Sequence, residues 1–451
     1  MPPTTLLVAI MLIEYLVSST ALAFTTRQSI KRQLCLLLLI SLAFGEIRLL
    51  FSLSGPQLLR GVFAFSCLVK LLHFTSLFLI QQVEIQQILN PQTSKSCATR
   101  LRTAFNFLTS TRGIGTSWEV KSRRQVQHSS HARLPTKRRY ISSTILVLFW
   151  QYLALDLLGF GGLRYFHREW PDALAVGTEF PFLQGSVTKE QLLARIPLSC
   201  ILVANLRLLF AMIYGLLSVV CVGLQLSSPA DWTPVFGTVQ GWARDGYSIR
   251  SFWGQYWHQL LRFPLVTISG FIRRNLLPTS VFASSTEAQT QAIDTVLVFC
   301  LSGILHMLSA VYAGVPDNVG AIFLFFAMQP VAIIAEHSIL GMVHAPERHG
   351  NDRRSNAHDD ERKERRGRGW QLLLGPAWTL LWFYLSAPWF AYTALRLPVE
   401  TNAAMPFSFV EAFGPRVMAG VVCLSWLSWN LGAGVQTQAQ KEKEKTKMRV
   451  G

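Results

Sequence analysis

Residues 293–315 read IDTVLVFCLSGILHMLSAVYAGV, with a histidine near the middle of an almost entirely apolar run. A helix needs about 20 predominantly apolar residues to cross the hydrocarbon core of a membrane, and this run is long enough. Comparable runs recur along the chain, at roughly 6–24, 34–53, 61–80, 141–160, 196–225, 319–341, 371–397 and 413–433. We therefore predict an all-α, polytopic integral membrane protein with about nine transmembrane helices.

The composition agrees with this class. Of the 451 residues, 50% are hydrophobic and 15% are charged, and the formal net charge is +17. The charge lies between the apolar runs rather than in one polar domain, which fits nucleic-acid binding poorly. With nine spans, 32 Lys and Arg residues lie on one side of the membrane and five on the other. Because basic loops stay on the cytosolic side, we expect a lumenal amino terminus and a cytosolic carboxyl terminus, in the endoplasmic reticulum membrane.

We expect one membrane domain over residues 1–451, with two basic cytosolic loops at 81–140 and 342–370. Both loops are poor in apolar residues, and we expect them to be mobile. No Lys or Arg precedes the first run, so we expect it to remain as an uncleaved anchor. The seven cysteines form no CxxC pair and predict neither a disulfide framework nor a metal site.

Residues 252–262, FWGQYWHQLLR, are too few and too polar to cross the membrane. As a helix, the segment would place its aromatic and leucine side chains, including Trp253 and Trp257, on one face. His258 and Arg262 would lie on the other face with Gln255 and Gln259. We predict an amphipathic interfacial helix near 252–262. Its His258 either contacts solvent or lines the mouth of a cavity.

The run at 293–315 carries a narrow polar stripe. Thr295, Ser302, His306 and Ser309 fall within about 60° of one another on a helix. An ionisable group near mid-membrane usually faces a water-filled cavity or a partner, although a packing role between helices is the alternative. A neutral imidazole in such a place can accept a hydroxyl proton as a general base, with Ser302 as a possible neighbour.

Other ionisable residues within the apolar runs suggest structural roles. Glu336 and His337 end the run at 319–341, where a charge pair with a neighbouring span is expected. Lys70, His73 and Arg207 are interpreted as structural. None of the common nucleophile-elbow, phosphate-loop, zinc-protease or dinucleotide motifs occurs.

Three stretches together resemble the membrane-bound O-acyltransferase superfamily. They are SIRSFWGQYWHQLLR at 248–262, FCLSGILHMLSAVYAG at 299–314 and FFAMQPVAIIAEH at 325–337, with PADWTPVFGTVQG at 229–241 leading in. More narrowly, the chain is similar to the wax-synthase-like branch, which includes fungal acetyltransferases of terpenoid and meroterpenoid pathways. The resemblance covers residues 200–340, the expected acyltransferase core.

This resemblance implies transfer of an acetyl or other acyl group from an acyl-coenzyme A co-substrate to a hydroxyl of a lipophilic acceptor, with no permanently bound cofactor. It makes His306 the catalytic base. At the position of His258 much of the superfamily has asparagine, so His258 is expected to stabilise the oxyanion, position substrate or act structurally. Trp253, Trp257, Ser302 and Ser309 are expected to line the cavity. Candidate contacts for the coenzyme A phosphates are Arg244, Arg250, Arg262, Arg273 and Arg274, which otherwise only set topology.

Three alternatives remain open from the sequence. A long-chain alcohol acceptor would make the protein a wax synthase. A transporter would use His306 on a substrate or proton path, although the chain shows no repeated halves. A non-catalytic membrane scaffold would not need His306 at all.

Overall fold

A computed structural model describes residues 3–52, 57–89, 96–113, 136–183, 187–244, 247–278, 285–315, 317–343, 357–397 and 407–425. Within these ranges every regular element is a helix and no strand occurs. In the described part of the chain, seven helical stretches are long and apolar enough to cross a membrane: Thr5–Phe24, Ile30–Ser52, Leu59–Ile80, Lys137–Glu169, Lys189–Gly223, Glu287–Ala313 and Val319–Ser338. The prediction of an all-α, polytopic integral membrane protein is confirmed.

The last two expected spans have a different form. Residues 371–397 belong to the second half of the long helix α17 (Ala357–Leu395). Residues 413–433 correspond in part to a short apolar helix, Pro415–Ser425, and the rest of this run lies outside the described residues. The number of spans therefore stays a prediction.

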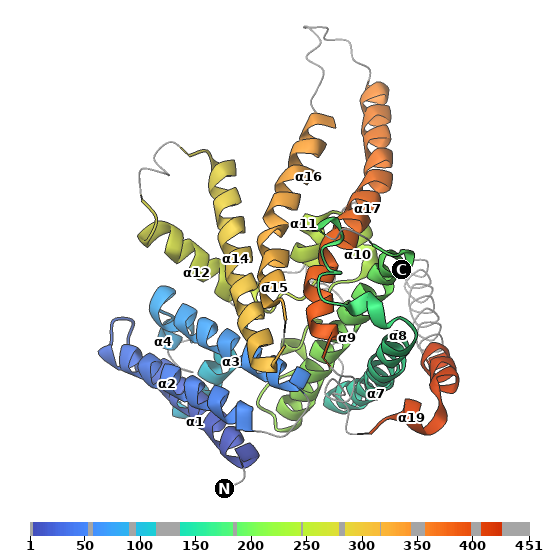
Figure 1. The fold of residues 1–451 in the computed structure, drawn as a ribbon. Coiled ribbons are helices and arrows are strands. Elements are labelled where there is room, and N and C mark those ends of the chain that lie inside the picture. Colours follow the sequence, from blue (N-terminus) through green and yellow to red (C-terminus); the bar gives the residue numbers. More distant parts are fainter. Residues whose placement is uncertain are drawn as a thin grey trace, which may run out of the picture.

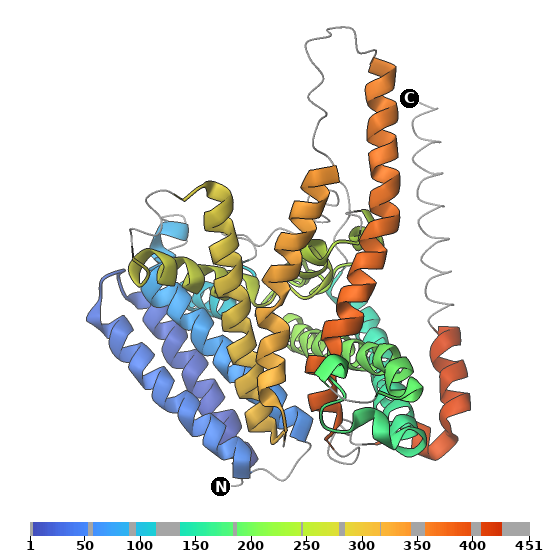
Figure 2. The ribbon, with the colours of Figure 1, turned by 45° about the horizontal axis from the view of Figure 1, so that its top comes forward.

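The amino-terminal helices form one bundle. α1 (Pro3–Phe24), α2 (Ile30–Ser52) and α3 (Gln57–Thr75) lie side by side in Figures 1 and 2, and α3 continues into the π-helix η1 (Ser76–Ile80). α5 (Cys97–Thr109) packs on α1 and buries Ala104 and Leu108 in the shared core. Part of the expected loop at 81–140 is thus a packed amphipathic helix, and residues 357–370 of the other expected loop are helical. Residues 90–95 and 114–135 of the first loop, and 344–356 of the second, lie outside the described residues.

A second bundle comprises α7 (Lys137–Asp156), the π-helix η3 (Leu157–Leu163), α8 (Arg164–Glu169), α9 (Lys189–Gly223) and α17. Its core includes the fully buried Leu198 and Tyr392. Arg195 of α9 is also buried, and its guanidinium donates to the backbone carbonyls of Thr178 and Leu385, among others. A buried charge is tolerable here because carbonyl oxygens replace its water.

α14 (Glu287–Ala313) lies between the two bundles and packs against α3, α12 (Arg262–Asn275) and α15 (Val319–Ala327). Its start is fixed by a reciprocal pair of hydrogen bonds between Thr286 and Gln289, and it ends at Gly314, whose φ of 78° suits glycine. α16 (Gln329–Val343) follows α15 almost directly. α14 thus joins α3 of the first bundle to α12, α15 and α16.

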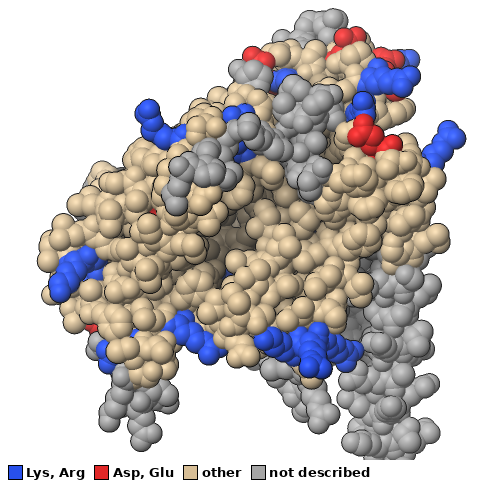
Figure 3. Space-filling view, turned by 90° about the horizontal axis from the view of Figure 1, so that it is seen from below, with Lys and Arg blue, Asp and Glu red and all other residues tan. Residues whose placement is uncertain are grey.

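The remaining short elements are α4 (Ile85–Ile88), η4 (Pro171–Leu174), η5 (Pro181–Leu183), η6 (Pro229–Asp231), α10 (Val239–Arg244), α11 (Ile249–Ser251), η7 (Phe252–Tyr256) and α19 (Phe409–Phe413). Figure 3 shows one face of the molecule, on which uncharged residues form a broad surface with a hollow near its centre. Lys and Arg lie mainly along the margins of this face. Such a distribution suits a protein that is surrounded by lipid.

Candidate active site

The aromatic segment is not one helix. α11 continues directly into the π-helix η7, which ends at Tyr256. The backbone of Trp257 is extended, with ψ 164°, and α12 begins only at Arg262. The expected helix near 252–262 is therefore wrong in its extent. The Trp257 N–H closes the π turn on the Phe252 carbonyl at 2.8 Å. Gln259 then takes the place of further helical turns, because its side-chain amide donates to the carbonyls of Trp253 and Trp257 at 3.1 and 3.0 Å.

This break changes where the side chains lie. On a continuous helix, the tryptophans and His258 would lie on opposite faces, but here Trp253, Trp257 and His258 all line one cavity. His258 is only 8% exposed, so it is not in contact with bulk solvent. No described residue hydrogen-bonds its buried Nδ1. Burial, and next the nearby imidazole of His306, lower the pKa of His258 to about 3, so this ring is neutral near pH 7.

The backbone at Gly237, just before α10, packs against the aromatic segment at residues 252–262. The Gly237 N–H donates to the Tyr256 carbonyl at 3.0 Å. A Cβ on Gly237 would stand 2.1 Å from the Gln255 carbonyl oxygen, so only glycine allows this approach. Arg207 of α9 donates to the Gly237 carbonyl at 2.8 Å and lies over the rings of Phe236 and Tyr256. Arg207 thus has a structural role, as expected.

Glu336 holds the same segment from the other side. Its carboxylate oxygens accept the backbone N–H groups of Ile249 and Arg250 at 3.1 and 3.3 Å. The expected charge pair between Glu336 and a neighbouring span is wrong, because the partners are the free N–H groups at the start of α11. These hydrogen bonds join α16 to α11, whose Arg250 lines the cavity.

His306 of α14 has a defined orientation. Its Nδ1 lies 2.8 Å from the backbone carbonyl of Ser302, and a carbonyl can only accept, so Nδ1 carries the proton. In the neutral ring the lone pair is then on Nε2, for which the described residues supply no hydrogen-bond partner. The Ser302 hydroxyl is 3.5 Å from Nδ1, at the limit of a hydrogen bond, so the Ser302 backbone does most of the positioning.

Aromatic rings hold the His306 imidazole on its other sides. Phe326 of α15 stacks on it, with ring centroids 4.2 Å apart and an interplanar angle of 24°. Phe65 of α3 and Phe390 of α17 contact it at 4.7 and 5.8 Å. Packing from three helices leaves the ring little rotational freedom, and its reactive nitrogen stays in place.

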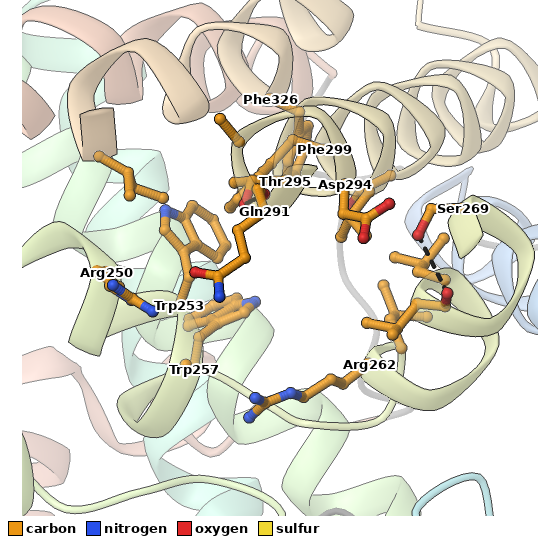
Figure 4. A pocket seen from close by; sticks show the side chains of 18 of the residues that line it. Arg250, Trp253, Trp257, Arg262, Ser269, Gln291, Asp294, Thr295, Phe299 and Phe326 are labelled. Atoms are coloured by element: carbon orange, nitrogen blue, oxygen red, sulfur yellow. Dashed lines mark hydrogen bonds between the residues drawn. The ribbon is translucent and has the colours of Figure 1, made fainter. Parts of the chain in front are cut away.

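These elements enclose a cavity of about 750 Å³ that reaches from the exposed Arg250 and Arg262 to His306 and Phe326. In Figure 4, Arg250, Trp253 and Trp257 form one wall, while Gln291, Asp294 and Thr295 of α14 form another. α12 supplies Arg262 and Ser269. Both histidines line this cavity, so the structure brings the two sequence segments into one site.

Most of the expected site residues converge here. His306, His258, Trp253, Trp257, Ser302, Arg250 and Arg262 all line the cavity, and so does Thr295 of the polar stripe. Ser309 does not, because its hydroxyl donates to the Gly61 carbonyl of α3 at 2.7 Å. Ser309 thus joins α14 to α3 one turn below the end of the cavity.

Two of the five candidate arginines are also outside the lining. Arg273 forms an ion pair with Asp294, its Nε 2.7 Å from the carboxylate, and Arg274 is an exposed residue of α12 that curls back over Gly270. The Arg244 side chain lies outside the described part of the structure. Among the described residues, no group of three His, Cys, Asp or Glu side chains could hold a metal ion.

Sequence reasoning missed Phe326, Gln259 and Glu336 as parts of the site. Phe326 is one of several phenylalanines in an apolar run, and no periodicity singles it out. Gln259 and Glu336 act on backbone groups that become free only because the helix breaks. Had the break been foreseen, an amide two residues after the second tryptophan would have been the signal.

Comparison with known proteins identifies similar sequences of one enzyme class. The model of the membrane bound O-acyl transferase family matches residues 232–328, which include both histidines and the tryptophans. The chain is 29% identical to acetyltransferase pyr8 of Aspergillus fumigatus over 401 residues, covering 84% of this chain and 86% of the relative. It is 28% identical to acetyltransferase atnC of Arthrinium sp, covering 72% and 69%, and 26% identical to acetyltransferase nanB of Aspergillus nanangensis, covering 93% and 97%. No solved structure matches the chain.

The family match and the acetyltransferases among the relatives indicate that this chain is an acyltransferase enzyme. Residues 232–328 match the model of the membrane bound O-acyl transferase family, and the chain as a whole is similar to fungal acetyltransferases. The predicted resemblance and the predicted enzyme class are confirmed.

Proposed function

We propose that this enzyme transfers an acetyl group from acetyl-coenzyme A to a hydroxyl group of a lipophilic secondary metabolite, such as a terpenoid or meroterpenoid alcohol. The observation that carries the proposal is the orientation of the His306 ring. Its Nδ1–H is held by the Ser302 carbonyl, its Nε2 has no partner among the described residues, and the residue lines a cavity open at its mouth. A volume of about 750 Å³ lies within the range of roughly 300–1,000 Å³ that is usual for small-molecule sites.

In this mechanism His306 Nε2 accepts the hydroxyl proton while the alcohol oxygen attacks the thioester carbonyl carbon. The tetrahedral intermediate collapses by breaking the carbon–sulfur bond. The proton then passes from the His306 imidazolium to the leaving thiolate, which restores the neutral histidine and releases coenzyme A. No covalent acyl-enzyme is needed.

His258 is the candidate donor to the oxyanion. It is neutral and lines the same cavity, and one of its ring nitrogens carries a proton that can be donated. A well-placed donor of this kind stabilises the transition state by roughly 3 kcal/mol. The buried Nδ1 without a described partner supports a role toward bound substrate, because buried polar groups are otherwise hydrogen-bonded.

The two ends of the cavity differ in the substrate that they suit. Arg250 and Arg262 are exposed at the mouth, where guanidinium groups can bind the coenzyme A phosphates. Apolar side chains, among them Leu265, Val266, Val298 and Ile334, line much of the wall and suit a lipophilic acceptor.

We further propose that the enzyme lies in the endoplasmic reticulum membrane with a lumenal amino terminus. The basic loops support this topology, in which the donor enters from the cytosolic side.

The test is acetyl transfer by the purified protein in detergent. Labelled acetyl-coenzyme A is offered with a panel of sesquiterpenoid, diterpenoid and meroterpenoid alcohols and with hexadecanol, and the esters are identified by mass spectrometry. We expect acceptor-dependent acetate formation with at least one polycyclic alcohol. Release of coenzyme A that is the same with and without every alcohol would contradict the proposal, and esters formed only with hexadecanol would indicate a wax synthase.

A further inference from the structure

One aromatic side chain of the cavity lining lies directly against His306. Phe326 lines the cavity beside His306, whereas Phe65 and Phe390, which contact the His306 ring from other sides, do not line it. Phe326 is itself 4% exposed and lies flat against the imidazole. Past His306, therefore, the first obstacle that a bound molecule meets is the Phe326 ring.

The position of this ring is set by the close approach of two helices. Gly303 of α14 lies three residues before His306, and a Cβ there would stand 3.0 Å from the Phe323 ring and 3.1 Å from the Phe323 carbonyl oxygen. The same Cβ would stand 3.3 Å from the Phe326 Cβ. Because glycine lets α15 lie this close, Phe326 stacks directly on the catalytic histidine and leaves no gap between them.

The direction of the donor follows from the proposed function, on which this inference rests. Its nucleotide end lies at the arginines of the mouth and its thioester lies at His306. The carbon atoms beyond the carbonyl then extend away from the mouth, toward Phe326. An acetyl group ends there, whereas each further methylene has to displace a ring that is packed on all sides.

We propose that Phe326 is the specificity-determining residue that restricts the donor to a short acyl chain. Phe326 belongs to an apolar cluster with the buried Ile322, Phe325 and Ala387 and with the half-buried Phe390, whose ring centroid is 5.7 Å from its own. Removing the Phe326 ring would therefore open an apolar cavity in line with the donor. Apolar cavities of this kind remain dry and bind apolar molecules.

The experiment measures binding rather than turnover. Non-reactive S-ethyl, S-butyl and S-hexyl thioethers of coenzyme A are titrated into the purified wild type and the Phe326→Ala variant in detergent. We expect affinity for the wild type to fall with each step, by roughly tenfold or more for a methylene without room. In Phe326→Ala the S-hexyl thioether is expected to bind at least as tightly as S-ethyl.

Phe325→Ala is the matched control. Phe325 is 5% exposed, stacks on Phe390 at 5.7 Å and does not line the cavity, so its loss removes the same volume without opening the donor path. It should keep the wild-type order of affinities. If Phe326→Ala is not recovered as folded protein, Phe326→Leu provides the same comparison with a smaller shift.

The outcomes separate the two proposals. If the wild type binds none of the thioethers, the donor in the proposed function is wrong. If the wild type binds S-ethyl best and Phe326→Ala and Phe326→Leu keep the same order, the proposed function stands and the role of Phe326 is overturned. A wild type that binds all three thioethers equally would also overturn that role.

Discussion

Two clusters of ionisable side chains, one in the amino-terminal bundle and one at the cavity, are built in opposite ways. In the amino-terminal bundle, Lys70 of α3 pairs with Glu46 of α2 at 2.8 Å and with Glu14 of α1, and all three are at most 9% exposed. Cys67 adds a hydrogen bond to Glu46 at 3.0 Å. None of these residues lines the cavity, so the charges of this triad serve one another.

The histidines line the cavity, whereas the residues of the triad do not. His306 has one nitrogen bound to Ser302 and the other left free, and His258 has a buried nitrogen without a described partner; both face the cavity. Ionisable groups within a membrane are costly in either case. The difference teaches that depth alone does not indicate catalysis. The proposed catalytic role rests on an unpaired nitrogen in a residue that lines the cavity. A charge that is paired across three helices indicates a role in assembling the bundle.

The largest effect is expected at His306. Glutamine keeps a donor of similar size but cannot act as a base, so His306→Gln should lower acetyl transfer by about 10²- to 10⁴-fold. Thermal stability should change little. The measurement is turnover per folded enzyme, quantified by size-exclusion chromatography.

His73→Gln is the control for this variant. His73 is fully buried whereas His306 is half-buried, and the His73 Nε2 is 2.9 Å from the Phe107 carbonyl in the amino-terminal bundle, away from the cavity. It should retain near wild-type turnover. Equal losses in the two variants would mean that His306 matters only for packing.

Lys70→Met should have the opposite profile. It leaves two buried carboxyl groups without their cation, and breaking such a group is expected to destabilise the fold by about 3–5 kcal/mol. Acetyl transfer per folded molecule should be unchanged. Thermal unfolding in detergent measures the first quantity and the transfer assay the second.

Replacing the whole triad sharpens the comparison. Substituting Glu14, Glu46 and Lys70 all by Met removes every buried charge at once, and such replacements are often neutral or stabilising. We expect stability close to wild type. A loss of activity in the stable triple variant would show that the triad takes part in the reaction.

The smallest effect is expected from two serines on the same helix. Ser309→Ala removes the hydrogen bond from α14 to the Gly61 carbonyl and should lower stability by about 1 kcal/mol without changing turnover. Ser302→Ala keeps the carbonyl that holds His306 and should also leave turnover near wild type. A large drop for Ser302→Ala alone would assign the orienting role to its hydroxyl.

The sequence predicted the parts of this protein that depend on local pattern. Hydropathy located the membrane helices, because the lipid core demands long apolar runs. The polar stripe on residues 293–315 located His306, because a regular helix preserves angular spacing. Of the four residues in the stripe, only Ser309 does not line the cavity, which ends one turn before it.

Features that depend on tertiary contacts could not be predicted. Residues 252–262 have helical periodicity, but Gln259 and the close approach of Gly237 to Gln255 and Tyr256 favour a break after Tyr256. Glu336 looked like half of a charge pair because its partners are backbone groups of α11. The partners of Lys70 lie in two other helices, so no sequence spacing connects them.

The central claim is that His306 Nε2 meets the acceptor hydroxyl inside this cavity. Its most direct test is an electron cryomicroscopy structure of the protein with the S-ethyl thioether of coenzyme A and an accepted alcohol. We expect the alcohol oxygen at about 2.6–3.2 Å from His306 Nε2, with the thioether sulfur beside it. An alcohol bound elsewhere while Nε2 is hydrogen-bonded to the protein would contradict the account.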